Sequence, residues 1–175
     1  MKVVRNIIVG FIAIVYFVFV IINTIFMLNI NDFGVTQFDE KTLVVIKSNI
    51  SSDKYKKGDL VIVEKPRFDQ IEIEDELFVY KIKKDGSPII DIGVVGDLHE
   101  RNQAVSFANG AGYDMDYIIG KEAKVLPEIG TYFGVVQSQW GFLFIILVPS
   151  FLIFIYELYA IIVEIKYGKP ELSGK

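Results

Sequence analysis

Three serines in one short polar turn are the residues of this chain whose type best suits covalent chemistry. Ser48, Ser51 and Ser52 lie in the stretch SNISSDKYKKGD, between the apolar runs TLVVI and LVIV. A serine attacks a carbonyl only when a base within hydrogen-bonding distance takes its proton. A turn of this composition is also common as a purely structural feature, because serine hydroxyls bond the nearby backbone. We expect a structural turn, with Ser51 and Ser48 as the fallback nucleophiles.

The chain offers few bases to such a serine. It contains a single histidine, His99, and no cysteine. Histidine titrates in the range that general-base catalysis needs, but His99 follows Gly96-Asp97 and is predicted to lie in an exposed turn. Lys81 and Lys83 alternate with apolar residues on a predicted strand, which favours solvated charges. His99 is therefore only a fallback catalytic residue.

Metal and cofactor chemistry has no signal in the sequence. One histidine and no cysteine are too few for a His or Cys metal cluster. The spacing of Asp53, Asp91, Asp114 and Asp116 does not follow a calcium-binding loop. We expect no metal site, no cofactor and no disulfide framework.

Two apolar segments flank the part of the chain that could carry a site. Residues 7–28 hold no charge, and as a helix these 22 residues would extend about 33 Å. This run is longer than the roughly 7–15 apolar residues of a cleavable signal peptide, so an uncleaved anchor is predicted. A second apolar run begins at Trp140 and contains only Glu157 and Glu164 as charged residues before Lys166. We expect Glu164 to be interfacial, and Glu157 is a candidate helix–helix contact.

Basic residues at the two ends predict the orientation of the chain. Lys2 and Arg5 precede the first apolar run, and Lys166, Lys169 and Lys175 follow the second. The positive-inside rule then places both termini in the cytoplasm. We expect a two-pass plasma-membrane protein with an extracytoplasmic central domain. The predicted divisions are a tip and first span (1–30), a β domain (31–138), a second span (139–165) and a cytoplasmic tail (166–175).

The central residues, 31–138, favour a mostly β fold, a small antiparallel domain between two transmembrane helices. Asp85-Gly86 is a strong hairpin signal, and no helical periodicity is evident. The domain carries 13 Lys or Arg and 19 Asp or Glu, a net charge of −6, which argues against nucleic-acid binding. Six runs rich in Val, Ile or aromatic residues predict strands: Thr42–Ile46, Leu60–Glu64, Glu76–Ile82, Pro88–Val95, Gln103–Phe107 and Glu122–Leu126.

Four framework segments, taken in order, resemble type I signal peptidases of the archaeal, endoplasmic-reticulum and sporulation-type branch. The segment KKGDLVIV (56–63) resembles the strand that follows the catalytic serine in that branch. IEDELFVY (73–80) resembles the second Gly-Asp strand, with Glu74 where glycine is usual. IIGKEAKVLPEIG (118–130) and QSQWGFLFIILVP (137–149) resemble the late segment and the start of the terminal span. The resemblance implies a β domain of signal-peptidase type.

The catalytic motifs of that family are not kept. Counting back from Gly58, the position of the nucleophile in the motif S-G-S-M-x-P-T falls on Ile50. The position of the general base falls near Ile92, and Ala111 stands where an acidic partner is expected. Isoleucine has no lone pair with which to attack a carbonyl. The resemblance therefore implies a scaffold without its catalytic residues.

The predicted function is that of a non-catalytic, membrane-anchored accessory that binds secreted or surface preproteins, for example in pilus assembly. Its partners would be these preproteins, the lipid bilayer and another membrane protein of a secretion complex, and no nucleic acid. The predicted substrate-binding strand consists of Leu60, Val61, Ile62 and Val63. Two alternatives stay open: an active signal peptidase that uses Ser51 or Ser48, and a two-span structural subunit of a membrane complex.

Overall fold

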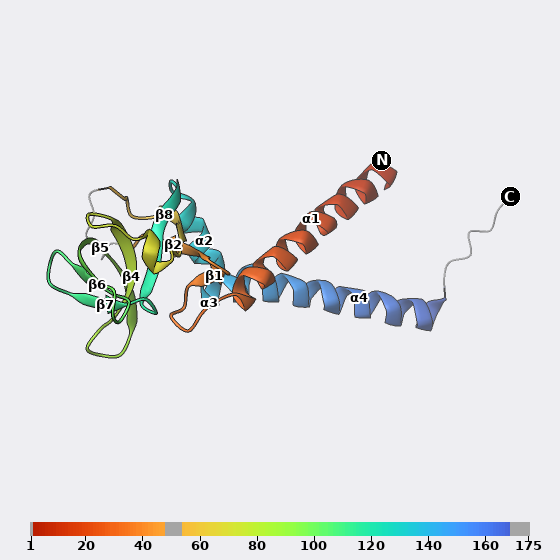
Figure 1. The fold of residues 1–175 in the computed structure, drawn as a ribbon. Coiled ribbons are helices and arrows are strands. Elements are labelled where there is room, and N and C mark those ends of the chain that lie inside the picture. Colours follow the sequence, from red (N-terminus) through yellow and green to blue (C-terminus); the bar gives the residue numbers. More distant parts are fainter. Residues whose placement is uncertain (1, 48–53, 169–175) are drawn as a thin grey trace. The chain divides into compact units, whose positions relative to one another are not determined.

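One long helix and an eight-stranded antiparallel sheet make up the larger part of the structure (Figure 1). The structure is a computed structural model and describes residues 2–47 and 54–168. It divides into two units between Gly134 and Val135. The first unit contains α1 (Lys2–Leu28), β1 (Thr36–Phe38), β2 (Lys41–Val45), β3 (Leu60–Glu64), η1 (Phe68–Gln70), β4 (Glu76–Ile82), β5 (Pro88–His99), β6 (Ala104–Phe107), β7 (Gly112–Asp114), β8 (Ile118–Leu126) and the start of α2 (Ile129–Gln137).

The second unit is helical. After the last residues of α2 it contains α3 (Gln139–Gly141), the π-helical η2 (Phe142–Leu147) and α4 (Val148–Tyr167). The segment Phe142–Lys166 is long and apolar enough to cross a membrane, and so is Ile7–Leu28 of α1. Almost none of the side chains in either segment is buried inside the protein. Two apolar helices are therefore present, as the composition predicted.

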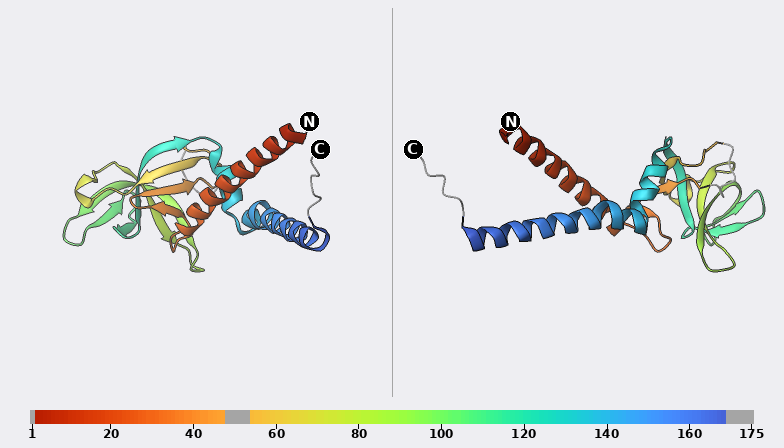
Figure 2. Two further views of the ribbon diagram at one scale, coloured as in Figure 1. Left: turned by 90° about the vertical axis from the view of Figure 1, so that its right-hand side faces the viewer. Right: turned by 180° about the vertical axis from the view of Figure 1, so that it is seen from behind.

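The sheet is a half-barrel with the strand order β1-β2-β3-β8-β4-β5-β6-β7, and all its neighbouring strands are antiparallel. Figure 2 shows from two further directions that its strands curve around an interior. Hydrophobic side chains fill two clusters. The first lies between β2, β3, β4 and β8 around Val44, Val61 and Phe78, and the second lies between β4, β5 and β6 around Leu77, Val95 and Phe107. The mostly β, antiparallel prediction is confirmed.

All six predicted strands are present, and the differences lie at their ends. β5 runs four residues beyond the predicted end, because the bulge between Val95 and Asp97 lets the ladder with β6 continue past Gly96. The prediction that His99 lies in a turn is therefore wrong, since His99 is the last residue of β5. β8 begins at Ile118, earlier than predicted. The sequence reading missed the short strands β1 and β7 and the helix α2.

β8 joins the two halves of the sheet, and Gly120 makes this possible. β8 pairs with β3 along its later residues and with β4 near its start. Gly120 has a φ of +139°, and an added Cβ atom would lie 2.0 Å from the carbonyl oxygen of Glu64. Only glycine permits this backbone and this close approach. A side chain at position 120 would separate β8 from the end of β3.

Two turns of the same construction precede β3 and β4. In the first, Gly58 has a φ of +96° and Asp59 accepts a hydrogen bond from the amide of Lys56. In the second, Glu74 has a φ of +75° and Asp75 accepts a hydrogen bond from the amide of Glu72. Position 74, where the resemblance expects glycine, thus keeps the left-handed backbone without the residue that tolerates it best.

Replacing Glu74 by glycine should stabilise the domain. The left-handed backbone disfavours a side chain with a Cβ atom, so we expect Glu74→Gly to raise the free energy of unfolding by about 0.5–1 kcal/mol. Glu72→Gly is the matched control, because Glu72 is exposed and has a negative φ, and it should lower stability by a similar amount. Urea unfolding of the full-length protein in detergent, followed by circular dichroism, measures both. Shifts of the same sign in the two variants would contradict this account of the turn.

Candidate functional site

The predicted serine turn falls outside the described residues. Ser48, Ile50, Ser51 and Ser52 all belong to residues 48–53. The described chain resumes at Lys54, and Lys54 and Tyr55 are the first side chains after the turn. The contacts of Lys54 and Tyr55 show which titratable groups lie next to the point where the described chain resumes.

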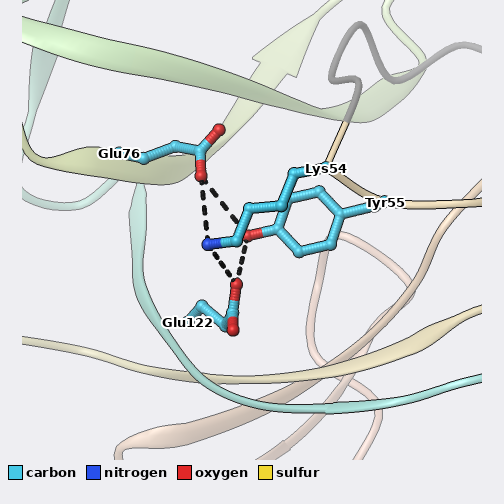
Figure 3. A network of polar contacts seen from close by, with 4 residues as sticks. All are labelled: Lys54, Tyr55, Glu76 and Glu122. Atoms are coloured by element: carbon cyan, nitrogen blue, oxygen red, sulfur yellow. Dashed lines mark hydrogen bonds and ion pairs between the residues drawn. The ribbon is translucent and has the colours of Figure 1, made fainter.

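Lys54 and Tyr55 contact two carboxylates that belong to different strands (Figure 3). Glu76 is the first residue of β4, and Glu122 lies within β8. The Tyr55 hydroxyl donates a hydrogen bond of 2.6 Å to Glu122 Oε2, and Lys54 Nζ lies 2.5 Å from the same oxygen. Glu76 Oε2 is farther away, 3.5 Å from Lys54 Nζ and 3.4 Å from the Tyr55 oxygen. Figure 3 shows both groups reaching between the two carboxylates.

The network keeps Lys54, Tyr55 and Glu122 in their ordinary charge states. The hydrogen bond to Glu122 raises the pKa of Lys54, and the hydrogen bonds from Lys54 and Tyr55 lower the pKa of Glu122. Burial, together with the hydrogen bond to Glu122, raises the pKa of Tyr55. Lys54 thus stays protonated at neutral pH, and Tyr55 stays neutral. Neither of these two groups is therefore in the form that takes a proton from a serine.

Ile92 lies on β5 opposite Phe78 of β4. The resemblance to type I signal peptidases put the general base near this position. The half-buried side chain of Ile92 packs against the first hydrophobic cluster, which also contains Tyr55. The side chain at this position is therefore a hydrocarbon that packs against the core. A base at residue 92 would have to be desolvated beside Phe78.

His99 contacts a serine that the sequence reading did not single out. His99 Nε2 lies 2.8 Å from Ser106 Oγ, across the ladder between β5 and β6. The pair joins a serine to a base, but His99 is exposed, and the nearby Asp97 directs a carboxylate oxygen to the amide of Leu98. Alternate residues of a strand share a face, so His99 lies on the same face as Asp97, which pairs with Ser106. Knowledge of this register would have identified Ser106 as a neighbour of His99.

Lys81 is an ion-paired surface lysine. Its Nζ lies 3.0 Å from Asp91 Oδ2 across the β4–β5 ladder, and its side chain is 51% exposed. The hydrogen bond to Asp91 raises the pKa of Lys81. The prediction of a solvated charge fits this position, and a neutral catalytic lysine does not.

In the described part of the sheet, β2 and β5 are each paired along only part of one side, which leaves an open stretch on each in addition to the outer edges of the terminal strands β1 and β7. The carbonyl oxygen of Val94 accepts a hydrogen bond from Ala108 on the side away from β4, so the backbone groups of Ile90 and Ile92 point to that side too. Just after β2, Ile46 exchanges backbone hydrogen bonds with Gly58 and Asp59, so its neighbours Val45 and Lys47 point away from β3. In the described residues, no strand pairs with β5 over residues 88–93 on this side, or with β2 beyond Leu43 on the side of β1.

Both open edges line one cavity of about 100 Å³. It has room for about three water molecules or one small side chain. Phe33 forms part of its wall and stacks on Tyr80 with the ring centroids 3.9 Å apart. The complete lining is Phe33, Gly34, Val35, Val45, Lys47, Tyr80, Pro88, Ile89 and Ile90. Most of its lining side chains are apolar, and Lys47 is the one charged residue among them.

The strand predicted to bind substrate is an interior strand. β3 pairs with β2 on one side and with β8 on the other, so neither edge is open to an added strand. The side chains of Leu60, Val61 and Val63 are buried, and that of Ile62 is half-buried. The assignment of these four residues to substrate binding stays a prediction, and the geometry favours the edges of β2 and β5 instead.

The structure adds no metal site in its described ranges, 2–47 and 54–168, where no group of three or more His, Asp or Glu side chains could hold an ion. The chain matches no protein-family model, no curated protein and no solved structure. The resemblance to signal peptidases therefore rests on the sequence motifs alone.

Acid should weaken the network around Glu122. A carboxylate whose pKa is lowered on folding contributes stability above its unfolded pKa, near 4.5, and this contribution is lost as the pH falls through the folded value. Glu122→Gln should lower stability by about 1 kcal/mol at pH 7 and should lose less on going to pH 3.5 than the unaltered protein loses. Thermal unfolding at the two pH values measures the difference.

Asp75→Asn is the matched control for this acid effect. Although burial opposes it, the hydrogen bonds from Lys121 and from the amide of Glu72 lower the pKa of Asp75, so this variant removes a separate part of the acid dependence. The two effects should add, because Glu122 pairs with Lys54 and Tyr55 whereas Asp75 pairs with Lys121. An acid dependence that is unchanged in Glu122→Gln would show that the network does not link folding to pH.

Proposed function

We propose that this protein is a membrane-anchored binding protein whose β domain holds an extended segment of a secreted or surface protein and does not cleave it. Its two apolar helices would span the plasma membrane with both termini in the cytoplasm. The bound segment would lie between β2 and β5, beside the residues that leave α1. The bilayer and a further membrane protein of a secretion or assembly complex would be its other partners.

The observation that carries this proposal is the pair of open strand edges that flank one cavity. Val45 at the end of β2, Lys47 two residues after it, and Ile90 and Ile92 on β5 point backbone groups toward the open sides, where an extended chain can pair with them. The cavity between the edges can accept one small side chain of that chain. Backbone pairing supplies affinity without strict sequence requirements, which suits a protein that handles several preproteins.

Three side chains of the β domain that do not line the cavity support binding without catalysis. Ile92 offers no base, Lys54 is held protonated by Glu122, and Lys81 is held protonated by Asp91. A serine among residues 48–53 would find none of these three groups able to accept its proton. A scaffold can keep its binding edges after losing such chemistry, because fold and reaction are separate properties.

The alternative with an observation in its favour is a serine hydrolase. His99 and Ser106 already lie at hydrogen-bonding distance. This pair lies at the far end of β5 from Ile90, and neither residue lines the cavity described above. A peptidase that used Ser51 or Ser48 would need another base, and a two-span structural subunit would bind no peptide at all.

Filling the cavity should block peptide binding. We expect Val45→Trp to weaken binding of a fluorescent synthetic signal peptide by about tenfold or more, measured by anisotropy with the full-length protein in detergent. Ile62→Trp is the matched control, because Ile62 is also half-buried but lies on β3, outside the cavity. Normal binding by Val45→Trp together with loss in Ile62→Trp would instead favour the strand Leu60–Val63 as the binding site.

Removing one backbone donor tests the pairing itself. Ile90→Pro deletes an amide that points away from β4, so the β4–β5 ladder keeps its hydrogen bonds. We expect binding of the same peptide to weaken about fivefold, as loss of one hydrogen bond of about 1 kcal/mol implies. Circular dichroism confirms that the variant is folded. Unchanged affinity would show that the ligand does not pair with β5.

The same peptide with a fluorogenic scissile bond separates binding from catalysis. We expect no cleavage by the unaltered protein, or by variants carrying Ser48→Ala, Ser51→Ala, Ser52→Ala or Ser106→Ala. Cleavage that disappears in one of these variants identifies a nucleophile and makes the protein an enzyme. A folded protein that neither binds nor cleaves the peptide fits the structural-subunit alternative.

A further inference from the structure

Glu157 is a carboxylate in the interior of the apolar segment Phe142–Lys166. It lies on α4, about nine residues before the end of that segment, which is about 14 Å along a helix. Its side chain is exposed on the surface of the helix. An ionised carboxylate is unfavourable in hydrocarbon unless a partner neutralises it, so acidic residues at this depth generally mark a contact.

The chain itself offers no cation at the depth of Glu157. Residues 7–28 of α1 contain no Lys, Arg or His. Lys166 follows Glu157 by nine residues, which places it two and a half turns along the helix and on the opposite face. Lys2 and Arg5 precede the apolar segment of α1, on the predicted cytoplasmic side. A cation that pairs with Glu157 at this depth would therefore come from another molecule.

Three polar residues of α4 share one face. Ser150, Glu157 and Glu164 are spaced by seven residues, so they lie within a narrow stripe along the helix. Ala160 lies on the same side, three residues after Glu157, and its small side chain permits close approach of another helix. A seven-residue spacing is also the repeat at which two packed helices stay in contact.

We infer that α4 binds a membrane-spanning helix of a partner protein that carries a lysine or arginine at the depth of Glu157. The negative charge of Glu157 is complementary to the positive charge of such a lysine or arginine. The stripe of Ser150, Glu157 and Glu164 marks the side of α4 on which the partner helix packs. The inference rests on the proposed membrane-spanning orientation of α4. It assigns the second helix a recognition role in addition to anchoring, separate from the peptide-binding edges of the β domain.

The test uses energy transfer in lipid vesicles between the full-length protein and a synthetic transmembrane helix. Because the chain contains no cysteine, Lys175→Cys provides a single labelling position. The probe is a leucine- and alanine-rich helix with one central lysine, and its control has leucine at that position. We expect the lysine helix to associate about tenfold more tightly than the leucine helix. Glu157→Gln should abolish this preference, and Glu164→Gln should retain it.

Three results would overturn the inference. One is equal association of the two helices, and another is an unchanged preference in Glu157→Gln. The third is energy transfer between labelled copies of the protein that Glu157→Gln removes, because it would make a second copy the occupant of the stripe.

Labelling of the Lys175→Cys variant from either side of the vesicle with a membrane-impermeant maleimide separates this failure from that of the proposed function. If α4 does not cross the bilayer, the proposed two-pass orientation fails and the inference fails with it. If α4 crosses but the lysine helix gains nothing, only the inference about Glu157 fails, and the proposed peptide-binding function still stands.

Discussion

The antiparallel pairing of β8 with both β3 and β4 is the constraint on which the domain depends. Apart from this strand, no ladder in the described sheet joins β1–β3 to β4–β7. The junction requires Gly120, whose backbone approaches Glu64 too closely for a side chain. β8 also carries the two residues that form ion pairs with the preceding turns, since Lys121 contacts Asp75 and Glu122 contacts Lys54.

The same arrangement explains where the half-barrel has open strand edges. β8 takes one side of β3 and one side of β4, and β2 and β5 take the other sides. Among the described residues, β1 covers the far side of β2 only up to Leu43, and β6 covers that of β5 only from Val95, so part of each far side stays open beside the cavity that Phe33 lines. An extended ligand would complete hydrogen bonds that the described sheet leaves open, which is the usual basis of strand addition.

The titratable side chains of this protein differ in whether they pair with an opposite charge. Lys54, Lys81 and Lys121 each form an ion pair with a carboxylate. His99 contacts only the hydroxyl of Ser106 among the hydrogen bonds described. Glu157 differs from all of these, because it lies inside the apolar segment Phe142–Lys166, and the apolar segment of α1 contains no Lys, Arg or His. The recognition role that we infer for Glu157 follows from this isolation and from the proposed membrane span.

Local patterns in the sequence determined the two apolar helices, the six main strands and the hairpin at Asp85-Gly86, because these depend on hydrophobic periodicity and turn chemistry within short segments. The composition also limited the chemistry, since one histidine and no cysteine leave few catalytic sets. Only the tertiary structure decided that β3 is interior, that β5 continues through its bulge to His99, and that Glu122 meets Lys54. These facts depend on which strands pair across long sequence separations, and strand pairing is chosen by the packing of the whole core and leaves no signal in a local window.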